Sequence, residues 1–405
     1  MTAVMKGVRI LEVAAHPFVP AASAILADWG AEVIKIEHVE RGDAMRGLMS
    51  SGIALMNTKV HVLLEHSNRG KQSLGLDLTT ADGIDILYRL AATCDVFLTN
   101  KLPGVRTKLQ IEREQLREHN PRMIYVSGTG HGERGPEIER GSYDSLGFWA
   151  RAGVASGVMR PEADVVPSPP GPAFGDSIGA MTIAGGIMGA LFHRERTCEA
   201  ITVDVSLLGV GMWAQAASIA LALQMGQPMA PPPLNTPTRN PLVASYKTQD
   251  NRHIALTCLQ AMRYWPDMCR VIGRPDCIDD PRFADHQSLA DHGDEAASIV
   301  REAFASAPLA DWRVRLADFS GQWAVVQTTL EVVDDPQAVA NGYVQDLETA
   351  DGIPFRLVAA PVQYGGAPST PSRAPHFNEH GDAILASIGL DEEQIIDLKI
   401  RGVVA

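Results

Sequence analysis

Hydrophobic and polar residues follow two alternating periods along the first 130 residues. Short apolar runs predict buried strands at 8–13, 32–37, 73–78, 95–99 and 123–127. Helical periodicity between these runs predicts helices at 21–29, 82–92 and 111–119. Strands separated by helices are joined by right-handed crossovers, so we expect the strands to lie parallel in one sheet. The chain therefore begins as a Rossmann-like α/β domain, a fold that does not by itself specify a ligand.

The pattern changes after a Pro/Gly-rich loop at 165–175. A helix of small apolar residues at 177–192, a strand at 201–206 and a helix to about residue 223 are expected next. Six prolines in the fourteen positions of 228–241 then predict a stiff connector and a domain boundary. Beyond it we expect a strand at 253–257, helices including 265–272, and a terminal helix at 391–399. The predicted fold is a large α/β domain (1–225), a linker and smaller α+β domain (226–325), and a return segment that completes the large domain (326–405).

Composition and charge narrow the classes of function. Of the 405 residues, 45% are hydrophobic and 20% charged, with a net charge of −13. The negative charge opposes binding to nucleic acid or to an anionic membrane surface, and there is no uninterrupted apolar run of about 18 residues to span a bilayer. The chain has five cysteines and no C-x-x-C pair, which argues against a disulfide-stabilised scaffold and against a zinc ribbon. We therefore expect a cytoplasmic protein.

Common cofactor motifs are missing or incomplete. The stretch Gly128-Thr-Gly-His-Gly132 follows a predicted strand, but Glu133 stands where a dinucleotide fingerprint needs its third glycine. Gly70-Lys71 lacks the remainder of a phosphate-binding P-loop. There is no H-E-x-x-H, and the twelve histidines show no spacing typical of metal ligands. We expect no metal and no permanently bound cofactor.

One G-x-S-x-G motif occurs, at Gly175-Asp-Ser-Ile-Gly179. A hydrolase nucleophile elbow requires a buried strand running directly into the serine. The preceding Pro/Gly loop is a poor central strand, so Ser177 is interpreted as an ordinary residue of a helix first turn.

Asp176 is the carboxylate that we single out, and two interpretations of it stay open on the residues alone. It can cap the following helix, because an Asp oxygen accepts a hydrogen bond from a first-turn amide. It can instead be a nucleophile, stabilised by the helix N-terminus and flanked by glycine amides free to hold an oxyanion.

The chain resembles the class III CoA-transferase family, which includes formyl-CoA and carnitine CoA-transferases and the related α-methylacyl-CoA racemases. The resemblance covers nearly the whole chain and depends on many short motifs in the order of the family. They are 26–37 (LADWGAEVIKIE) with Gly42-Asp43, Asn68-Arg-Gly-Lys71, Leu76-Asp77-Leu78, Asp95-Val96, Asn100, Pro103-Gly104, Asn120-Pro-Arg122, Tyr143-Asp144, Gly175-Asp176, 193–197 (HRERT), 280–283 (DPRF), Asp335-Pro-Gln337 and Glu379-His380.

The resemblance implies roles for particular residues. Asp176 falls on the nucleophilic aspartate of the family. The positions that contact CoA in the family fall on Ala14, His38, Leu76, Asn100, Lys101 and Lys108. Four of these differ from the residues of formyl-CoA transferases, which carry Gln and Arg at the first two positions and Phe and Arg at the last two. Lys101 and Lys108 supply candidate phosphate-binding cations, or are simply solvated lysines.

One dipeptide separates transferase from racemase. The racemases place a histidine where Tyr143 stands, and we count Tyr143 and Asp144 with the CoA-facing residues. A tyrosine, whose pKa is normally near 10, is a poor base for removing an α-proton. An acyl-CoA:carboxylate CoA-transferase is therefore the expected function. The alternatives are an acyl-CoA racemase or isomerase, and a CoA-binding protein without catalysis.

The resemblance also implies chemistry and assembly. Asp176 is expected to form an aspartyl–acyl anhydride and then an aspartyl–CoA thioester, with CoA as substrate. Exchange of one thioester for another needs no metal or redox cofactor. The implied partners are acyl-CoA, a carboxylic acid and a second copy of the chain in an interlocked homodimer.

Overall fold

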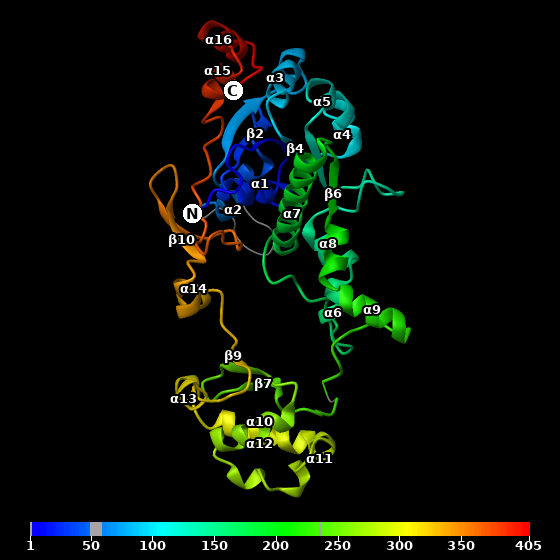
Figure 1. Ribbon diagram of the computed structural model, residues 1–405, viewed down its shortest axis with the longest axis vertical. Helices are drawn as coiled ribbons and strands as arrows, with labels where there is room; N and C mark the ends of the chain where they lie inside the picture. The colour runs from blue at the N-terminus through cyan, green and yellow to red at the C-terminus, as the bar shows by residue number, and fades with distance from the viewer. Residues whose placement is uncertain (1, 49–58, 235) are drawn as a thin grey trace. The chain divides into compact units, whose positions relative to one another are not determined.

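The computed structural model describes residues 2–48, 59–234 and 236–405, which divide into two compact units. The first consists of Met1–Pro231 and Pro336–Ala405, and the second of Pro232–Asp335. Both boundaries lie later in the chain than 225/226 and 325/326. Because the second unit is inserted between two parts of the first, the chain leaves the large unit and returns to it (Figure 1).

A six-stranded parallel sheet forms the centre of the large unit, with strand order β3-β2-β1-β4-β5-β6. The strands are β1 (Arg9–Val13), β2 (Glu32–His38), β3 (Gln72–Leu76), β4 (Val96–Thr99), β5 (Ile124–Thr129) and β6 (Thr202–Ser206). The expected parallel sheet is confirmed, since every neighbouring pair is parallel. The strand order reverses between β1 and β4, and such a switch point is where open α/β sheets bind ligands at their carboxyl edge.

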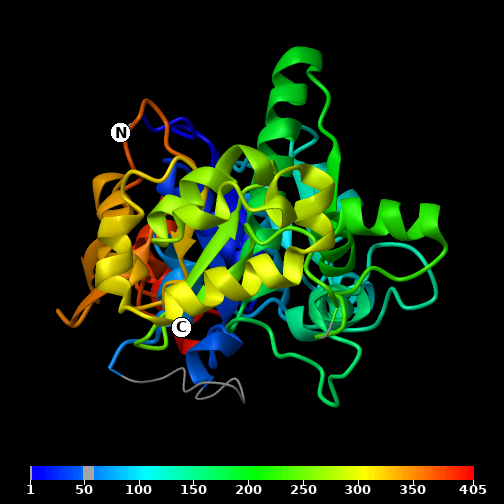
Figure 2. The same cartoon turned by 90° about the horizontal axis from the view of Figure 1, so that it is seen from below.

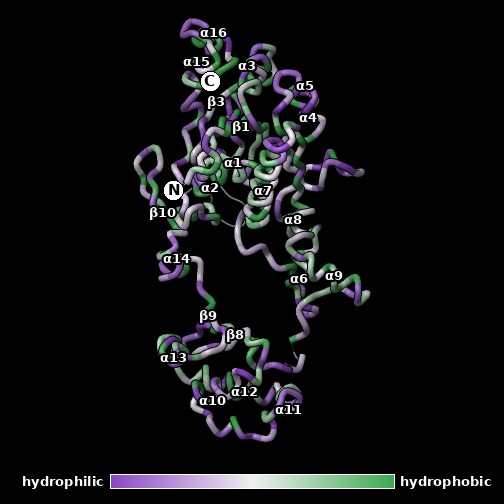
Figure 3. Tube along the Cα trace, in the orientation of Figure 1, coloured by the Kyte–Doolittle hydropathy of each residue, from purple (hydrophilic) through white to green (hydrophobic). Residues whose placement is uncertain are grey.

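Helices cover both faces of this sheet. On one face α1 (Phe18–Asp28) lies beside α7 (Phe174–Thr197), and their buried side chains share a core with β1, β4 and β5 (Figure 1). The other face is covered by α3 (Ala81–Ala91), α5 (Arg113–His119), α15 (Gly381–Ser387) and α16 (Glu392–Ile400). In Figure 3, α5 and the neighbouring α4 (Pro103–Lys108) are largely hydrophilic, consistent with their exposed sides.

Shorter elements complete the large unit. They are η1 (Ala44–Gly47), α2 (Val62–Asn68), η2 (Ser145–Arg151), α6 (Val154–Val158), α8 (Leu207–Ala214), α9 (Ala216–Met225), α14 (Pro336–Ala340), β10 (Val344–Glu348) and β11 (Pro354–Val358). The single helix expected up to residue 223 is two helices, α8 and α9, with a 70° bend between them.

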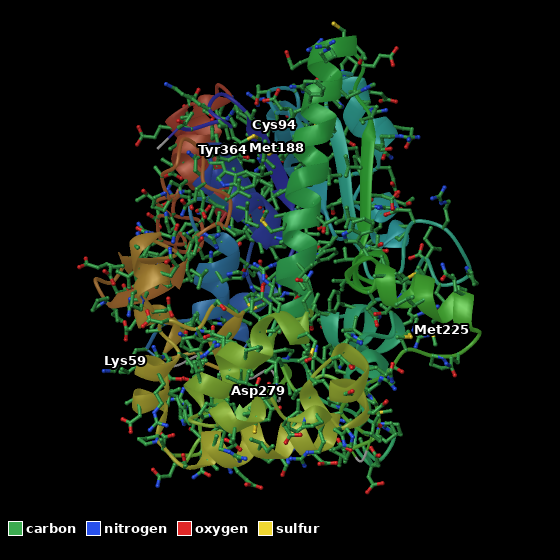
Figure 4. The ribbon with its side chains drawn as sticks, turned by 60° about the horizontal axis from the view of Figure 1, so that its bottom comes forward. Lys59, Cys94, Met188, Met225, Asp279 and Tyr364 are labelled. Atoms are coloured by element: carbon green, nitrogen blue, oxygen red, sulfur yellow. The ribbon has the colours of Figure 1, made fainter. Side chains whose placement is uncertain are left out.

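The return segment is part of the core of the large unit. Tyr364 packs edge-to-face on Trp29, with ring centroids 5.4 Å apart, and its hydroxyl lies 3.6 Å from Sδ of Met188 on α7 (Figure 4). At the far end of the chain, Val404 bridges to Leu76 at the end of β3. The last residues of the chain therefore pair with the carboxyl end of β3.

The second unit has its own core. It combines an antiparallel sheet of order β7-β8-β9 with helices that lie against the sheet (Figure 2). Its elements are β7 (Val243–Lys247), β8 (His253–Thr257), α10 (Ala261–Val271), η3 (Pro275–Cys277), η4 (Pro281–Phe283), α11 (His286–Asp291), α12 (Gly293–Ala305), α13 (Leu309–Arg315), β9 (Trp323–Val325) and η5 (Val332–Asp334).

Helix α7 is apolar along most of its length. Taken singly, α7 is the one helix among the described residues that is both long enough and apolar enough to cross a membrane. This finding concerns length and composition only, and buried core helices of other proteins share it. Its buried stripe, which includes Ala180, Ile183 and Ile187, belongs to the core with α1 and the sheet. We interpret α7 as a core helix whose other side is exposed.

Candidate active site

Two adjoining cavities lie at the carboxyl edge of the parallel sheet. The first, of about 370 Å³, is lined by the ends of β1, β2 and β3 and by the loops after them. The second, of about 560 Å³, is lined by the loops after β1, β4 and β5 and by the start of α7. Ala15, Ala44 and Lys101 line both, so the two cavities adjoin at the switch point between β1 and β4. Ligand sites are commonly of this size.

Most of the predicted site residues meet at these cavities. Ala14, His38, Leu76 and Lys101 line the first, and Asn100, Lys101, Tyr143 and Asp176 line the second. Asp144 lies beside Asp176 without lining either cavity. Lys108 is exposed at the end of α4 and lines neither cavity, although the next residue, Leu109, lines the first.

Asn100 fixes the shape of the loop after β1. Its Oδ1 accepts the backbone N–H of Ala15 at 3.2 Å, and its Nδ2 donates to the carbonyl of the same residue at 2.5 Å. This two-way bond joins the ends of β1 and β4 where the cavities meet. Asn100 thus shapes the site through Ala15, in addition to lining the second cavity.

A buried ion cluster lies under the same loop. Nζ of Lys35 is 2.7 Å from both Glu12 and Asp43, and Nζ of Lys71 is 2.7 Å from the other oxygen of Glu12. Lys35 also donates to the carbonyl of Ala14 at 2.9 Å. The two cations hold the pKa of Glu12 low despite its complete burial, and Lys35 lowers the pKa of Asp43 to about 2. Glu12, Asp43 and Lys35 therefore stay charged and anchor the cavity wall, whereas burial lowers the pKa of Lys71 to about 7.

The first turn of α7 brings Asp176 into the second cavity. Ala173 precedes the helix in the left-handed conformation (φ 57°), so the chain turns sharply out of the Pro/Gly loop. At Gly175 a Cβ would lie 2.5 Å from the ring of Phe148, so the helix approaches this ring closely only because the residue is glycine. Asp176 follows with its side chain buried, 8% exposed.

Asp144, rather than Asp176, interacts with the amide groups at the start of α7. Its Oδ2 accepts the backbone N–H of Gly175 at 3.3 Å. Burial raises the pKa of Asp144, and hydrogen bonds from the backbone N–H groups of Gly175, Phe174 and Asp176 offset part of that shift. Asp176 is the third residue of the helix and makes no side-chain cap. The capping interpretation of Asp176 is therefore wrong. The expectation that glycine amides are free for an oxyanion is also wrong for Gly175, whose N–H already has a partner.

The Asp176 carboxyl is in an environment that disfavours its charge. Burial, with a smaller contribution from the negative charge of Asp144, raises its pKa to about 8. Among the described residues it has neither a hydrogen-bond partner nor a paired cation. A buried carboxyl that faces a cavity and is not used structurally is typical of a functional group.

Sequence reasoning missed two residues at the cavities. His16, in a left-handed conformation (φ 66°) after β1, lines the second cavity with its ring edge-to-face on Tyr143 at 5.5 Å. Arg41 lines the first cavity beside His38. Neither position belongs to a motif, and both depend on the path of a loop. The positive φ of His16 is a tertiary feature that no local pattern signals.

The two motifs set aside in the sequence have structural roles. No strand leads into Ser177, whose hydroxyl donates to the carbonyl of Ala173 at 2.8 Å, so a nucleophile elbow is absent from this described segment. Glu133, which replaces the third glycine of a dinucleotide fingerprint, forms a bidentate pair with Arg106 at 2.7 and 2.8 Å. Among the described residues, no group of three or more His, Cys, Asp or Glu side chains is placed to hold a metal.

Comparisons with known proteins identify the family. The sequence model of CoA-transferase family III matches residues 5–381. The (R)-2-hydroxy-4-methylpentanoate CoA-transferase of Clostridioides difficile is 30% identical, with 99% of each chain covered. The cinnamoyl-CoA:phenyllactate CoA-transferase of Clostridium sporogenes is 29% identical over 98% of this chain and 96% of that protein.

Solved structures agree with these relatives. A CAIB/BAIF family protein from Brucella suis has a TM-score of 0.80 at 26% identity, covering 96% of this chain and 100% of the other. Rv3272 of Mycobacterium tuberculosis has a TM-score of 0.78 at 28% identity, covering 94% and 99%. The resemblance drawn from the motifs is confirmed along the chain: the protein belongs to CoA-transferase family III and is a CoA-transferase.

Proposed function

We propose that this enzyme transfers CoA from an acyl-CoA to a carboxylic acid through covalent intermediates on Asp176. The observation that carries the proposal is the unpaired, buried Asp176 carboxyl at the end of two adjoining cavities. CoA is long, with a phosphorylated nucleotide at one end and a thiol at the other. The two cavities give it one continuous path, with the thioester end beside Asp176.

In the first half-reaction an Asp176 carboxylate oxygen attacks the carbonyl carbon of the donor thioester. The C–S bond breaks, which leaves an aspartyl–acyl anhydride and CoA thiolate. The thiolate then attacks the Asp176 carbonyl of the anhydride. This step releases the donor as its carboxylate and leaves an aspartyl–CoA thioester.

The second half-reaction runs the same steps in reverse. The acceptor carboxylate attacks the aspartyl–CoA thioester and forms a new anhydride with release of thiolate. The thiolate attacks the acyl carbonyl that came from the acceptor, which yields the new acyl-CoA and restores the Asp176 carboxylate. No proton is consumed, so the residue must only be ionised at the start.

The second cavity favours a monocarboxylic acid with an apolar side chain. Phe18, Leu102, Val105 and Leu207 are among its lining residues, and Lys101 is the one Lys or Arg among the described residues that line it. If Lys101 pairs with CoA, the second carboxylate of a dicarboxylic acceptor has no lysine or arginine partner among the described residues that line this cavity. Two of the relatives are named for 2-hydroxy-4-methylpentanoate and phenyllactate, both apolar monocarboxylic acids.

CoA exchange between an acyl-CoA and an acid tests the proposal. We expect isocaproyl-CoA or cinnamoyl-CoA to donate its CoA to 2-hydroxy-4-methylpentanoate or phenyllactate, and mass spectrometry detects the new acyl-CoA. Succinate and glutarate should be poorer acceptors. Ser177→Ala is the matched control for Asp176→Asn, because it lies in the same helical turn without facing the second cavity. Loss of exchange in both variants, or in neither, contradicts the assignment to Asp176.

A second candidate function, acyl-CoA racemisation, is favoured by His16. This ring and Asp176 line the same cavity, and burial lowers the pKa of His16, so two groups able to carry a proton face one space. Deuterium incorporation at the α-carbon of an acyl-CoA in D2O, without an acceptor acid, identifies this activity. The transferase is favoured because the relatives named here are CoA-transferases.

We also propose a homodimer in the cytoplasm. Trp213 on α8 is 78% exposed and Leu223 on α9 is 80% exposed, and no residue of α9 is buried by the described part of the chain. Apolar surface of this kind is typical of an interface, and a second copy is the partner that the family resemblance implies. Five cysteines without a disulfide suit a reducing compartment.

A further inference from the structure

The loop after β1 presents His16 to the second cavity. The residue has a φ of 66°, and its backbone N–H donates to Oδ1 of Asp43 at 3.4 Å. A positive φ is uncommon for residues other than glycine. The neighbouring Ala15 lines both cavities, whereas His16 lines only the second of the two. The left-handed turn at His16 thus sets its imidazole in the cavity that holds Asp176.

A short run of contacts joins this imidazole to the start of α7. Its ring packs edge-to-face on Tyr143, with ring centroids 5.5 Å apart. The next residue, Asp144, accepts the backbone N–H of Gly175 on its Oδ2 at 3.3 Å. Gly175 directly precedes Asp176, so the imidazole lies at the end of the cavity that carries the proposed nucleophile.

Phe18 ties the same loop to α7 from a second direction. A Cβ at Gly179 would lie 2.3 Å from Cε2 of Phe18, so this ring packs directly against the backbone of α7 one turn beyond Asp176. Phe18, His16 and Asp176 all line the second cavity. An apolar ring, an imidazole and the proposed nucleophile therefore share one space.

The imidazole of His16 has both of its ring nitrogens available to a ligand. Neither nitrogen has a hydrogen-bond partner among the described residues, although the side chain is half-buried. Burial lowers the pKa of His16 from its usual 6.5. The charge of Asp43 opposes this shift, and the charges of Lys101 and Lys35 add to it. At neutral pH the ring therefore carries one N–H donor and one bare nitrogen that accepts.

The other polar side chains that line the second cavity have other partners or other parts in the reaction. Three of them already hydrogen-bond the backbone: Asn100, Thr129 and Ser142. Tyr143 is largely exposed, and Lys101 also lines the first cavity, where it is available to CoA. Among the described residues, His16 is thus the half-buried polar group beside Asp176 that neither the fold nor the proposed reaction uses.

We infer that His16 binds the 2-hydroxyl group of a 2-hydroxy acid acceptor, an inference that rests on the proposed function. The acceptor carboxylate attacks the aspartyl–CoA thioester at Asp176, so a substituent on its C2 lies one bond beyond the reacting group. A hydroxyl group both donates and accepts, so it matches whichever ring nitrogen faces the cavity. A carboxylate or a carbonyl only accepts and matches the N–H alone. His16 is therefore a specificity residue that acts on the acceptor and not on CoA.

Transfer of CoA from cinnamoyl-CoA to phenyllactate and to 3-phenylpropanoate, which lacks the hydroxyl group, tests the inference. We expect His16→Phe, which keeps an aromatic ring against Tyr143, to lower the ratio of kcat/KM for phenyllactate to that for 3-phenylpropanoate about tenfold. His119→Ala removes an exposed histidine that stacks on Tyr88 and lines neither cavity, and it is the matched control. An equal fall for both acids, which a structural role or a contact with the thioester would give, overturns the assignment, as does an unchanged ratio.

The wild-type enzyme supplies a second measurement that needs no variant. Because His16 contacts the acceptor from one side, we expect one enantiomer of phenyllactate to be used about tenfold better than the other and better than 3-phenylpropanoate. Equal kcat/KM values for the three acids overturn the inference while CoA transfer itself continues. Absence of transfer to all three contradicts the proposed function instead, which separates the two failures.

Discussion

At the scale of single residues, the surroundings of Asp176, the proposed nucleophile, favour the protonated form of its carboxyl group. The raised pKa of Asp176 follows from burial first and from the charge of Asp144 second. A carboxylate that is poorly solvated and unpaired is a stronger nucleophile once formed, because little hydration must be removed when it attacks. Asp144 therefore has two effects: it organises the start of α7 and it makes the Asp176 anion less stable.

The pH dependence of kcat/KM reports this pKa. The active form is the carboxylate, so we expect kcat/KM to fall about tenfold per pH unit below an apparent pKa of about 8. Asp144→Asn removes a neighbouring negative charge and should shift the profile to lower pH. Initial rates between pH 5.5 and 9.5 measure both profiles, and an unchanged midpoint in Asp144→Asn contradicts the charge effect.

The same pKa predicts a pH-dependent difference in stability. The unfolded carboxyl titrates near 3.8 and the folded one near 8, so between these values the folded state binds an extra proton. Unfolding free energy of the wild type should therefore fall, relative to Asp176→Asn, by up to about 1.4 kcal/mol per pH unit across this window. Urea titrations at pH 5 and pH 8.5 check this. A difference between the two proteins that stays constant with pH contradicts the raised pKa.

At the scale of elements, the ends of β1 and β2 are fixed by buried charge. The motif residues Lys35 and Lys71 meet Glu12 beneath the first cavity, although sequence reasoning treated them only as carriers of a family resemblance. Fully buried ion pairs contribute little net stability compared with apolar residues, but loss of one partner leaves an uncompensated charge. The cluster thus fixes the wall of the cavity, and substitution of any one of its charged residues should destabilise the fold.

Lys35→Met tests this cluster. It leaves Glu12 and Asp43 with one cation fewer, so we expect a loss of about 3–5 kcal/mol in unfolding free energy. Arg113→Ala, which breaks an exposed pair with Glu114, should cost less than about 1 kcal/mol. Chemical denaturation compares the two. A loss below 1 kcal/mol in Lys35→Met contradicts the role of the cluster.

The elements also show what the sequence could predict. Periodicity located the strands of the parallel sheet, because most residues of a strand that is buried on both faces are apolar. This held even though β1 and β2 also carry the buried charges of Glu12 and Lys35. The Pro/Gly loop and the apolar helix indicated where α7 begins to within a few residues. The hydrogen bonds at the start of α7 could not be predicted, because Asp144, which accepts the backbone N–H of Gly175, comes from a distant part of the sequence. His16 and Arg41 were missed for the same reason: their positions depend on loop paths.

At the scale of the whole molecule, the return segment and the exposed helices bear on assembly. Residues after Pro336 supply Tyr364 to one face of the sheet and α15 and α16 to the other, so the large unit is complete only when the chain has come back. Much of the apolar surface of α8 and α9 then stays exposed among the residues that the structure describes. A second copy is the proposed cover.

Dilution tests the dimer. If two chains are interlocked, they cannot separate without partial unfolding, so the dimer should persist at nanomolar concentration. Mass photometry at about 10 nM, together with light scattering at micromolar concentration, measures the mass. A monomer at micromolar concentration contradicts the proposed dimer. A dimer that dissociates on dilution contradicts interlocking.

The covalent role of Asp176 is tested most directly by trapping it. Incubation with acyl-CoA followed by hydroxylamine should convert the activated Asp176 carbonyl to a hydroxamate, found by mass spectrometry on the peptide that spans residues 171–192. Ser177→Ala should give the same label and Asp176→Asn none. Absence of the label in a wild-type enzyme that exchanges CoA, or exchange at the wild-type rate by a folded Asp176→Asn protein, would contradict the mechanism.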